Sequence, residues 1–289
     1  MLILFTDTDT DTTPEIAKEY GYNLISMPYS VGGKEIFPYE DFEVFDYQPF
    51  YAKLRKGTIP STSGISPSKY MNYFEPHFQN GDDILYVHFS TQLSGTFNAM
   101  NIAVDELLEK YPDRKFYTID TKAITICSLN IVREIGDLYK QGKTIDEIMD
   151  WAKEEVDKFA IYFYADDLKF FQRSGRVSNF KAIVGDFFGI KPIINIGSDG
   201  KMVSIGKGKG RIGALRKIIS YVEELQEDIK DHRVIIGHTD ALEIAEILAE
   251  MLREKFGQDL NIEFVIVNPT AGSHCGPDGI GVSFHAKHR

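Results

Sequence analysis

Hydrophobic residues in the first half of the chain form short runs that alternate with amphipathic segments. The short runs are rich in β-branched and aromatic residues, which predicts strands, and they cover residues 2–6, 23–31, 84–89 and 115–120. In the amphipathic segments apolar residues recur at helical spacing, which predicts helices at residues 14–20, 46–55, 67–80, 95–111 and around 131–138. This alternation is typical of a mostly parallel sheet covered by helices.

Three of the predicted helix starts carry capping signals. Thr13 and Ser66 each precede a proline, the arrangement in which a hydroxyl caps the helix and proline occupies its first turn. Thr144 and Glu147 have the spacing of a capping box, which predicts a further helix after residue 144. These signals locate the helix starts independently of the apolar periodicity.

The regular alternation of predicted strands and helices changes beyond about residue 156. Predicted strands at residues 160–165 and 191–196 flank a predicted helix at 178–188, and a hairpin turn at 197–200 returns through residues 201–205. Long helices at 210–227 and 242–256 then alternate with strands at 233–238 and 261–267. We therefore predict a two-lobed α/β protein, with a mostly parallel sheet in an N-terminal domain (residues 1–155) and an α+β C-terminal domain (residues 156–289).

Composition limits the kinds of partner. The formal net charge of −11 argues against nucleic acid, because phosphate binding needs clustered lysines and arginines. No stretch reaches the roughly 18 to 20 apolar residues of a spanning helix, and the first residues lack the basic region of an export signal, so we expect no stable membrane insertion. Two cysteines are too few for a disulfide scaffold or a thiolate metal site, which predicts a cytoplasmic location, no metal and no cofactor.

Hydroxyl side chains concentrate in two segments that precede predicted helices. Residues 60–67 include Thr62 and Ser66, and residues 90–96 include Ser94. Helix N-termini offer free N–H groups and the positive end of the helix dipole, and ligands of open α/β sheets collect beyond the carboxyl ends of strands. Both segments are therefore candidates for binding a carboxylate or a phosphate, although each hydroxyl could equally serve only as a cap.

Two further segments carry groups suited to an anion. Arg173 and Arg176 bracket a Ser-Gly pair, and arginine is well suited to bidentate anion recognition, though a lone arginine is usually a solvated surface group. A glycine-rich segment at residues 271–281 holds His274 on a tight backbone, where its role is either structural or functional. Ser94 and His274 also suggest an alternative, a serine-dependent acyl hydrolase, but the sequence has no G-x-S-x-G elbow.

Two other patterns give weaker signals. Residues 206–210 alternate glycine and lysine before a predicted helix, which would suit a phosphate-binding regulator, yet they lack the spacing of the dinucleotide fingerprint and of the P-loop. Asp7, Asp9 and Asp11 alternate as in calcium loops, without the glycine and the terminal glutamate of that motif. For these three carboxylates we predict a solvated loop or turn.

Taken in order, these segments resemble the DegV family of bacterial fatty acid-binding proteins over essentially the whole chain. The shared motifs are Phe5-Thr-Asp-Thr, Pro60-Ser-Thr-Ser, Phe89-Ser-Thr-Gln-Leu-Ser-Gly-Thr96, Asp120-Thr121, Ala165-Asp-Asp-Leu168, Arg173-Ser-Gly-Arg176, Ile190-Lys-Pro-Ile-Ile194 and His274-Cys-Gly-Pro-Asp-Gly279. Each motif is weak alone, whereas the ordered set is specific. The sequence departs from many relatives at Gly64-Ile65, where they have Gln-Pro, and at Ser174, where they have glycine.

The resemblance implies a lipid carrier, not an enzyme, with a long-chain fatty acid buried between the two lobes. Such carriers are the acyl-carrying subunit of a fatty acid kinase: they present the fatty acid's carboxylate to a separate kinase protein, which makes acyl phosphate. We expect the carboxylate on Thr62, Ser63, Ser94, Gly95, Thr96, Arg173 and His274. Our candidates for part of the acyl tunnel, which could equally be ordinary core, are Ile183, Val184, Phe187, Phe188 and Ile190.

Overall fold

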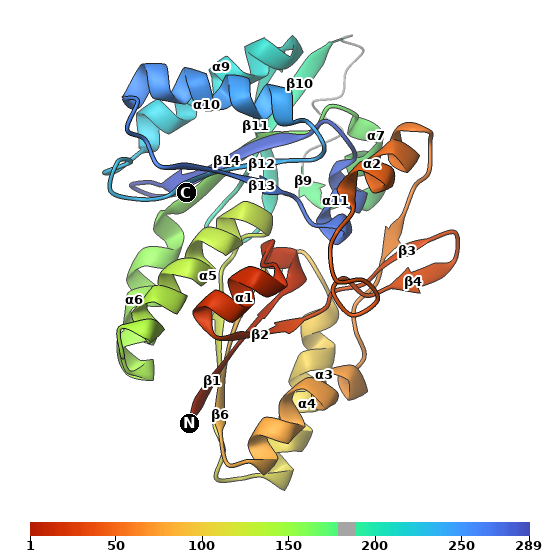
Figure 1. The fold of residues 1–289 in the computed structure, drawn as a ribbon, viewed down its shortest axis with the longest axis vertical. Coiled ribbons are helices and arrows are strands. Elements are labelled where there is room, and N and C mark those ends of the chain that lie inside the picture. Colours follow the sequence, from red (N-terminus) through yellow and green to blue (C-terminus); the bar gives the residue numbers. More distant parts are fainter. Residues whose placement is uncertain (179–188) are drawn as a thin grey trace.

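The computed structural model describes residues 1–178 and 189–289 (Figure 1). Its first half contains β1 (Leu2–Asp7), the 3-10 helix η1 (Thr8–Thr10), α1 (Pro14–Tyr20), β2 (Tyr22–Ile25), β3 (Tyr29–Val31), β4 (Lys34–Ile36), α2 (Tyr47–Arg55), β5 (Ser61–Thr62), α3 (Pro67–Gln79), β6 (Asp83–His88), α4 (Thr96–Lys110), β7 (Phe116–Asp120), α5 (Thr125–Lys140) and α6 (Ile145–Glu155). The second half contains η2 (Val156–Lys158), β8 (Phe159–Tyr164), α7 (Leu168–Ser174), β9 (Val177–Ser178), β10 (Ile190–Ile196), β11 (Met202–Lys209), α9 (Gly210–Leu225), β12 (Val234–His238), α10 (Leu242–Phe256), β13 (Ile262–Ile266), α11 (Pro269–Cys275) and β14 (Ile280–His285).

The strands form two main sheets and one small sheet. The first main sheet has the order β2-β1-β6-β7 and is parallel throughout. The second has the order β13-β12-β14-β8-β10-β11-β9 and mixes parallel and antiparallel pairs, while β4-β3-β5 form a small antiparallel sheet. The predicted α/β class and the parallel N-terminal sheet are therefore confirmed. The two main sheets use separate parts of the sequence, and the domain boundary near residue 155 stays a prediction.

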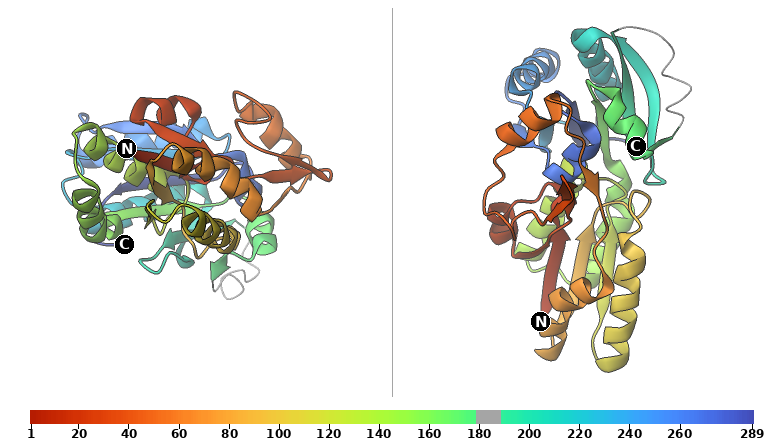
Figure 2. Two further views of the ribbon diagram at one scale, coloured as in Figure 1. Left: turned by 90° about the horizontal axis from the view of Figure 1, so that it is seen from below. Right: turned by 90° about the vertical axis from the view of Figure 1, so that its right-hand side faces the viewer.

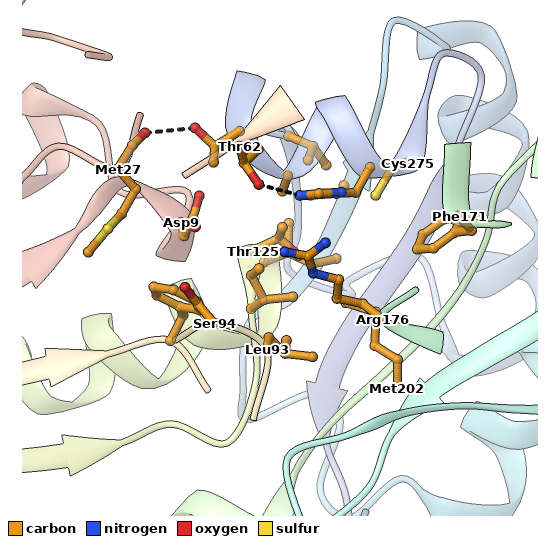
Figure 3. Close-up of a pocket in the computed structure, with 18 of the residues that line it drawn as sticks. Asp9, Met27, Thr62, Leu93, Ser94, Thr125, Phe171, Arg176, Met202 and Cys275 are labelled. Carbon is orange, nitrogen blue, oxygen red and sulfur yellow. Dashed lines mark hydrogen bonds between the residues drawn. The ribbon is translucent and has the colours of Figure 1, made fainter. Parts of the chain in front are cut away.

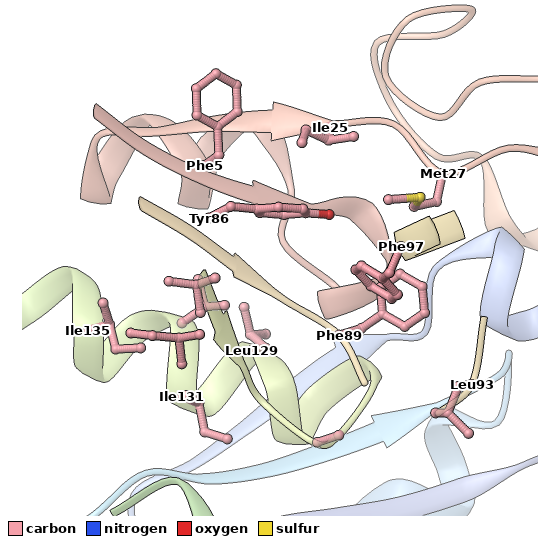
Figure 4. Close-up of a cluster of buried hydrophobic side chains, with 14 of the residues drawn as sticks. Phe5, Ile25, Met27, Tyr86, Phe89, Leu93, Phe97, Leu129, Ile131 and Ile135 are labelled. Atoms are coloured by element: carbon pink, nitrogen blue, oxygen red, sulfur yellow. The ribbon is translucent and has the colours of Figure 1, made fainter. Parts of the chain in front are cut away.

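Helix α5 joins the two main sheets. It packs against β8, β12 and β14 of the second sheet and against η1 at the end of β1, while α9 and α10 lie on the far side of the second sheet (Figures 1 and 2). One buried cluster accordingly runs from Phe5 and Tyr86 in the first sheet, through Ile126 of α5, to Ile161 and Ile235 in the second. Figure 4 shows the part of it between the first sheet and α5. The two halves thus share a continuous apolar core.

A third apolar cluster ties helix α2 to the C-terminal half. Phe50 and Tyr51 of α2 pack with Phe170 of α7, and the Tyr51 hydroxyl donates to the Val267 carbonyl at 2.9 Å. Figure 1 shows α2 beside α7 and α11, and Tyr29 of β3 also packs against Phe50 of α2. Segments from both halves therefore meet on this side of the molecule.

The predicted capping signals are confirmed. The side chains of Thr13 and Ser66 accept hydrogen bonds from backbone N–H groups in the first turns of α1 and α3. Thr144 and Glu147 form the reciprocal bonds of a capping box at the start of α6. In each case the side chain satisfies a backbone donor that the helix itself leaves free.

The structure corrects several other predictions. The single strand expected at residues 23–31 is divided into β2 and β3, with Pro28, which cannot donate to a ladder, between them. Residues 206–209 belong to β11 and pair with β10, so they form no anion-binding turn. The segment expected to be a loop from residue 168 contains α7, and neither α11 nor β14 was predicted. The helix predicted at residues 178–188 lies almost entirely outside the described residues.

None of the helices within residues 1–178 and 189–289 is both long enough and apolar enough to cross a bilayer.

Candidate functional site

A cavity of about 350 Å³ lies between the two halves of the chain, within the size range of small-molecule pockets. Its N-terminal wall consists of residues from η1, β5, the start of α4 and the start of α5. Its C-terminal wall includes residues from β8, α7, β11, β12, α11 and β14. The cavity therefore lies where the polar loops of the first sheet meet strands and short helices of the second half.

Two hydroxyl-bearing segments pack against each other on the N-terminal wall. Ser94 Oγ accepts a hydrogen bond from Thr96 N at 3.2 Å, just where α4 begins. Thr96 Oγ1 in turn accepts from Ile65 N at 3.2 Å. A Cβ atom on Gly64 would lie only 3.1 Å from Thr96 Cα, so glycine permits this close approach. The Ser94 hydroxyl donates to no other group within residues 1–178 and 189–289.

The starts of two long helices open into this cavity. Gly95 and Thr96 at the start of α4 line it, as do Ile124 and Thr125 at the start of α5. Neither helix has a side-chain cap at its N-cap residue. Thr125 has a φ of 55°, in the left-handed region, a conformation that is strained for a β-branched residue. The cavity thus faces backbone N–H groups and the positive ends of two helix dipoles.

Thr62 and His274 join the two walls. Thr62 lies on β5, His274 lies in the last turn of α11, and 2.8 Å separates Thr62 Oγ1 from His274 Nε2 (Figure 3). Burial, together with the nearby charge of Arg176, lowers the pKa of His274 to about 4. The imidazole is therefore neutral near pH 7, with one ring nitrogen donating and the other accepting.

The other predicted site residues divide into two groups. Ser63 also lines the cavity, and its Oγ donates to Glu35 Oε1 at 2.7 Å. Arg173, in the last turn of α7, is exposed and is not among the lining residues; Arg176 lines the cavity instead and extends toward its centre (Figure 3). Ile190 begins β10 without lining the cavity. The remaining tunnel candidates, Ile183, Val184, Phe187 and Phe188, lie outside the described residues.

The prediction that Asp7, Asp9 and Asp11 lie in a solvated segment is wrong. Their exposed fractions are 0%, 6% and 3%, because β1 delivers them to the carboxyl end of the parallel sheet, where other loops cover them. Asp7 accepts from Tyr86 OH, and Asp11 accepts from Asn268. Burial raises the pKa of Asp7 and of Asp11 to about 7, although these hydrogen bonds oppose the rise.

Apolar side chains complete the cavity. Figure 3 shows Thr62, Asp9 and Ser94 on one side of it and Phe171 and Met202 on the other. The apolar lining residues are Met27, Ile65, Phe89, Leu93, Ala99, Ile124, Ile126, Ile161, Phe163, Phe171, Met202, Val267, Ala271 and Ile280. Their separation along the sequence explains why periodicity within single elements did not reveal them. A cavity with grouped polar residues and long apolar walls suits an amphiphilic ligand.

The sequence model of the DegV family, described as uncharacterised proteins, matches residues 1–287. The chain belongs to the DegV family. A DegV domain-containing protein of Clostridium perfringens is 34% identical over 283 residues, which cover 98% of this chain and 96% of the relative.

Solved DegV structures share the fold. A fatty acid-binding DegV family protein from Thermus thermophilus superposes with a TM-score of 0.85 at 21% identity, covering 99% of each chain. A DegV family protein from Eubacterium eligens, loaded with heptadecanoic acid, superposes with a TM-score of 0.83 at 21% identity, covering 99% of this chain and 100% of its own. At these identities the similarity establishes the architecture of the chain.

Proposed function

We propose that this DegV protein binds a long-chain fatty acid in the cavity between its two halves. The observation that carries the proposal is the grouping of Thr62, Ser94 and His274 beside extended apolar walls. The Eubacterium eligens relative, which shares the fold, is loaded with heptadecanoic acid. A fatty acid has one anionic end and one long apolar tail, which are the two features that this cavity complements.

The carboxylate would be held by hydroxyls and backbone N–H groups from several segments. If His274 Nε2 carries the proton, it donates to Thr62 Oγ1, and the Thr62 hydroxyl is then free to donate to the carboxylate. Ser94 has a free hydroxyl proton, and Gly95 and Thr96 lie at the positive end of α4. Ser63 lies beside Thr62 on the same wall. Donors of this kind bind a carboxylate strongly because the acceptor is charged.

Arginine at the polar end would balance the negative charge. The sequence motif carries Arg173 and Arg176, and Arg176 is the one that lines the cavity. Its guanidinium extends into the cavity in Figure 3. We therefore assign the electrostatic contact with the carboxylate to Arg176. Arg173 is exposed at the end of α7, and we do not assign it to the carboxylate.

The apolar walls would supply most of the affinity. Each buried methylene contributes about 0.8 kcal/mol, so a long acyl chain gains far more from burial than the head group gains from hydrogen bonds. The ligand is thus retained by its tail and oriented by its carboxylate. Such a division fits a carrier that presents the carboxylate to a separate fatty acid kinase protein for acyl phosphate formation, as the DegV resemblance implies.

The geometry favours this carrier over the alternative, a serine-dependent acyl hydrolase. Within the described residues His274 is hydrogen-bonded to Thr62, and no hydrogen bond joins it to Ser94 or to a carboxylate. A serine nucleophile needs a base within hydrogen-bond reach, itself oriented by a third group. Ser94 instead accepts from the first turn of its own helix.

Native mass spectrometry of the gently purified protein tests the proposal. We expect a bound mass in the fatty acid range, and Ser94→Ala or Thr62→Ala should weaken fatty acid retention by about tenfold, since each removes a hydrogen bond to a charged group. Ser220→Ala, which removes a hydroxyl from α9 outside the cavity, is the matched control and should retain the ligand. Absence of bound fatty acid combined with ester hydrolysis that Ser94→Ala abolishes would contradict a carrier role.

A further inference from the structure

Asp9 differs from its two acidic neighbours in facing the cavity without a partner. Asp7 accepts from Tyr86 OH at 3.0 Å and Asp11 from Asn268 Nδ2 at 2.8 Å, so both are held within the protein. Asp9 is 6% exposed and lines the cavity, and neither of its carboxyl oxygens has a hydrogen-bond partner in residues 1–178 and 189–289; Oδ1 is fully buried, which leaves Oδ2 as the oxygen that faces the cavity. A buried polar group without a partner costs stability, which points to a partner supplied by the ligand.

Hydrogen bonds to the two residues before Asp9 fix its position. Thr8 Oγ1 accepts from Met27 N at 2.9 Å, and Asp7 Oδ2 accepts from Phe89 N at 3.3 Å; Met27 and Phe89 both line the cavity. The strand that follows Met27 pairs with the strand that carries Thr62. Asp9 is thus anchored to the segments that supply the hydroxyl groups.

Figure 3 shows the same placement directly. The carboxyl of Asp9 lies on the side of the cavity that carries Thr62 and Ser94, away from Phe171 and Met202. If the ligand's carboxylate contacts Thr62 and Ser94, the first carbons of its chain pass close to Asp9. Asp9 would therefore meet the ligand near its carboxyl end.

Burial favours the neutral form of the Asp9 carboxyl. Burial raises its pKa well above the ordinary value, and the charges of Asp7 and Asp11 raise it further. The described residues contain no group of three or more histidines, cysteines or acidic residues that could hold a metal ion. A neutral carboxyl has one O–H donor and one carbonyl acceptor, and an alcohol has the same pair of functions.

We propose that Asp9 recognises a hydroxyl group close to the carboxyl end of the ligand, so that the cavity selects fatty acids hydroxylated at the second or third carbon. This inference rests on the proposed function. A plain methylene beside Asp9 would leave its carboxyl desolvated and unpaired, which disfavours the unsubstituted acid. A hydroxyl at that point would pair with Asp9 Oδ2, either accepting its proton or donating to it. Sites that hydrogen-bond a hydroxyl discriminate strongly against ligands that lack it.

The test compares four sixteen-carbon acids: palmitic acid and its 2-hydroxy, 3-hydroxy and 16-hydroxy derivatives. Delipidated wild-type protein should bind the 2-hydroxy or the 3-hydroxy acid about tenfold more tightly than palmitic acid, as measured by competition with a fluorescent fatty acid. Asp9→Leu, similar in size and apolar, should abolish or reverse this preference while palmitic acid still binds. Asp9→Asn keeps a donor and an acceptor and should retain it.

The outcomes separate this inference from the proposed function. If palmitic acid binds the wild type as tightly as the two hydroxylated acids, or if Asp9→Leu leaves the ratio unchanged, the role of Asp9 is overturned and fatty acid binding stands. A preference for the 16-hydroxy acid would overturn the placement near the carboxyl end. If none of the four acids binds, the proposed function itself fails. The wild-type ratio decides the inference even if a variant fails to fold.

Discussion

The two walls of the cavity differ in the chemistry that they supply. The N-terminal wall contributes hydroxyls, helix N-termini and the buried carboxyl of Asp9. The C-terminal wall contributes the imidazole of His274 and the guanidinium of Arg176, together with apolar strand residues. Because Thr62 Oγ1 and His274 Nε2 are 2.8 Å apart, the polar end of the site exists only when both walls are in register. The proposed ligand binding would therefore depend on the contact between the halves.

The bonds that cross between the walls also differ in burial. The buried bonds include those from Asn268 to Asp11 and from the Thr270 hydroxyl to the Met27 carbonyl at 2.8 Å. At the edge, Arg55 pairs with Asp240 and Asp278 in the presence of solvent. Buried hydrogen bonds are costly to break, whereas exposed ion pairs contribute little. Substitutions at the two kinds of bond should therefore have very different effects.

The largest expected effect follows from Asn268→Ala. Asn268 Nδ2 donates to Asp11 Oδ1 at 2.8 Å, and its Oδ1 accepts from Ala271 N at 2.9 Å to cap α11. The substitution removes both bonds and leaves a buried carboxyl with the backbone donor alone, which should cost about 2–4 kcal/mol of unfolding free energy. Urea denaturation measures this loss.

Asn80→Ala is the matched control for that measurement. Asn80 Nδ2 donates to Asp82 Oδ2 at 2.7 Å, so it forms the same kind of side-chain pair, but Asn80 is exposed at the end of α3. We expect a loss below about 1 kcal/mol there. Equal losses in the two variants would show that burial between the walls does not increase the contribution of the Asn268 bonds to the unfolding free energy.

The difference between local signals and contacts between distant segments explains what the sequence could predict. Helices with caps such as Thr13, Ser66 and Thr144 were predicted because their signals are local. Among the predicted carboxylate ligands, Thr62, Ser63, Ser94, Gly95, Thr96 and His274 line one cavity. Their order along the chain had suggested a common site, and their role as ligands stays a prediction.

What escaped prediction depends on contacts between distant segments. The short α11 consists largely of small residues, and its cap, Asn268, gains its partner from Asp11, over 250 positions earlier in the chain. Asp9 appeared solvated because alternating carboxylates usually face water, and only the convergence of loops around β1 buries it. Likewise, the choice between Arg173 and Arg176 depends on where α7 ends, which its sequence did not indicate.

The second prediction uses pH to distinguish the walls. The pKa of His274 is about 4 in the folded protein, below the ordinary value of 6.5, so its contribution is complete above pH 6.5 and is lost as the pH falls toward 4. The pKa values of Asp7 and Asp11 are raised to about 7, so their ionisation reduces stability as the pH rises from about 4 to 7. Acidification therefore weakens the C-terminal wall and favours the N-terminal one.

His274→Gln should remove the first of these opposing effects. As the pH falls from about 6.5 to about 4.5, the wild type should lose about 1–2 kcal/mol more unfolding free energy than the variant. One proton can change this free energy by at most about 1.4 kcal/mol per pH unit. Urea midpoints across this range measure the difference. His288→Gln, at an exposed histidine, is the control for loss of an imidazole. A constant offset between variant and wild type across the range would mean that His274 is not held neutral by burial.

The smallest effect is expected at the exposed edge, from Arg55→Gln. Arg55 bonds Asp240 and Asp278, but 36% of its side chain is exposed and Arg211 also approaches Asp278, at 3.9 Å. Solvent screening and this second arginine should limit the loss to less than about 1 kcal/mol, and added salt should reduce it further. Urea denaturation at low and high salt measures both. A loss as large as that of Asn268→Ala, unaffected by salt, would mean that the edge holds the walls together as firmly as their buried bonds do.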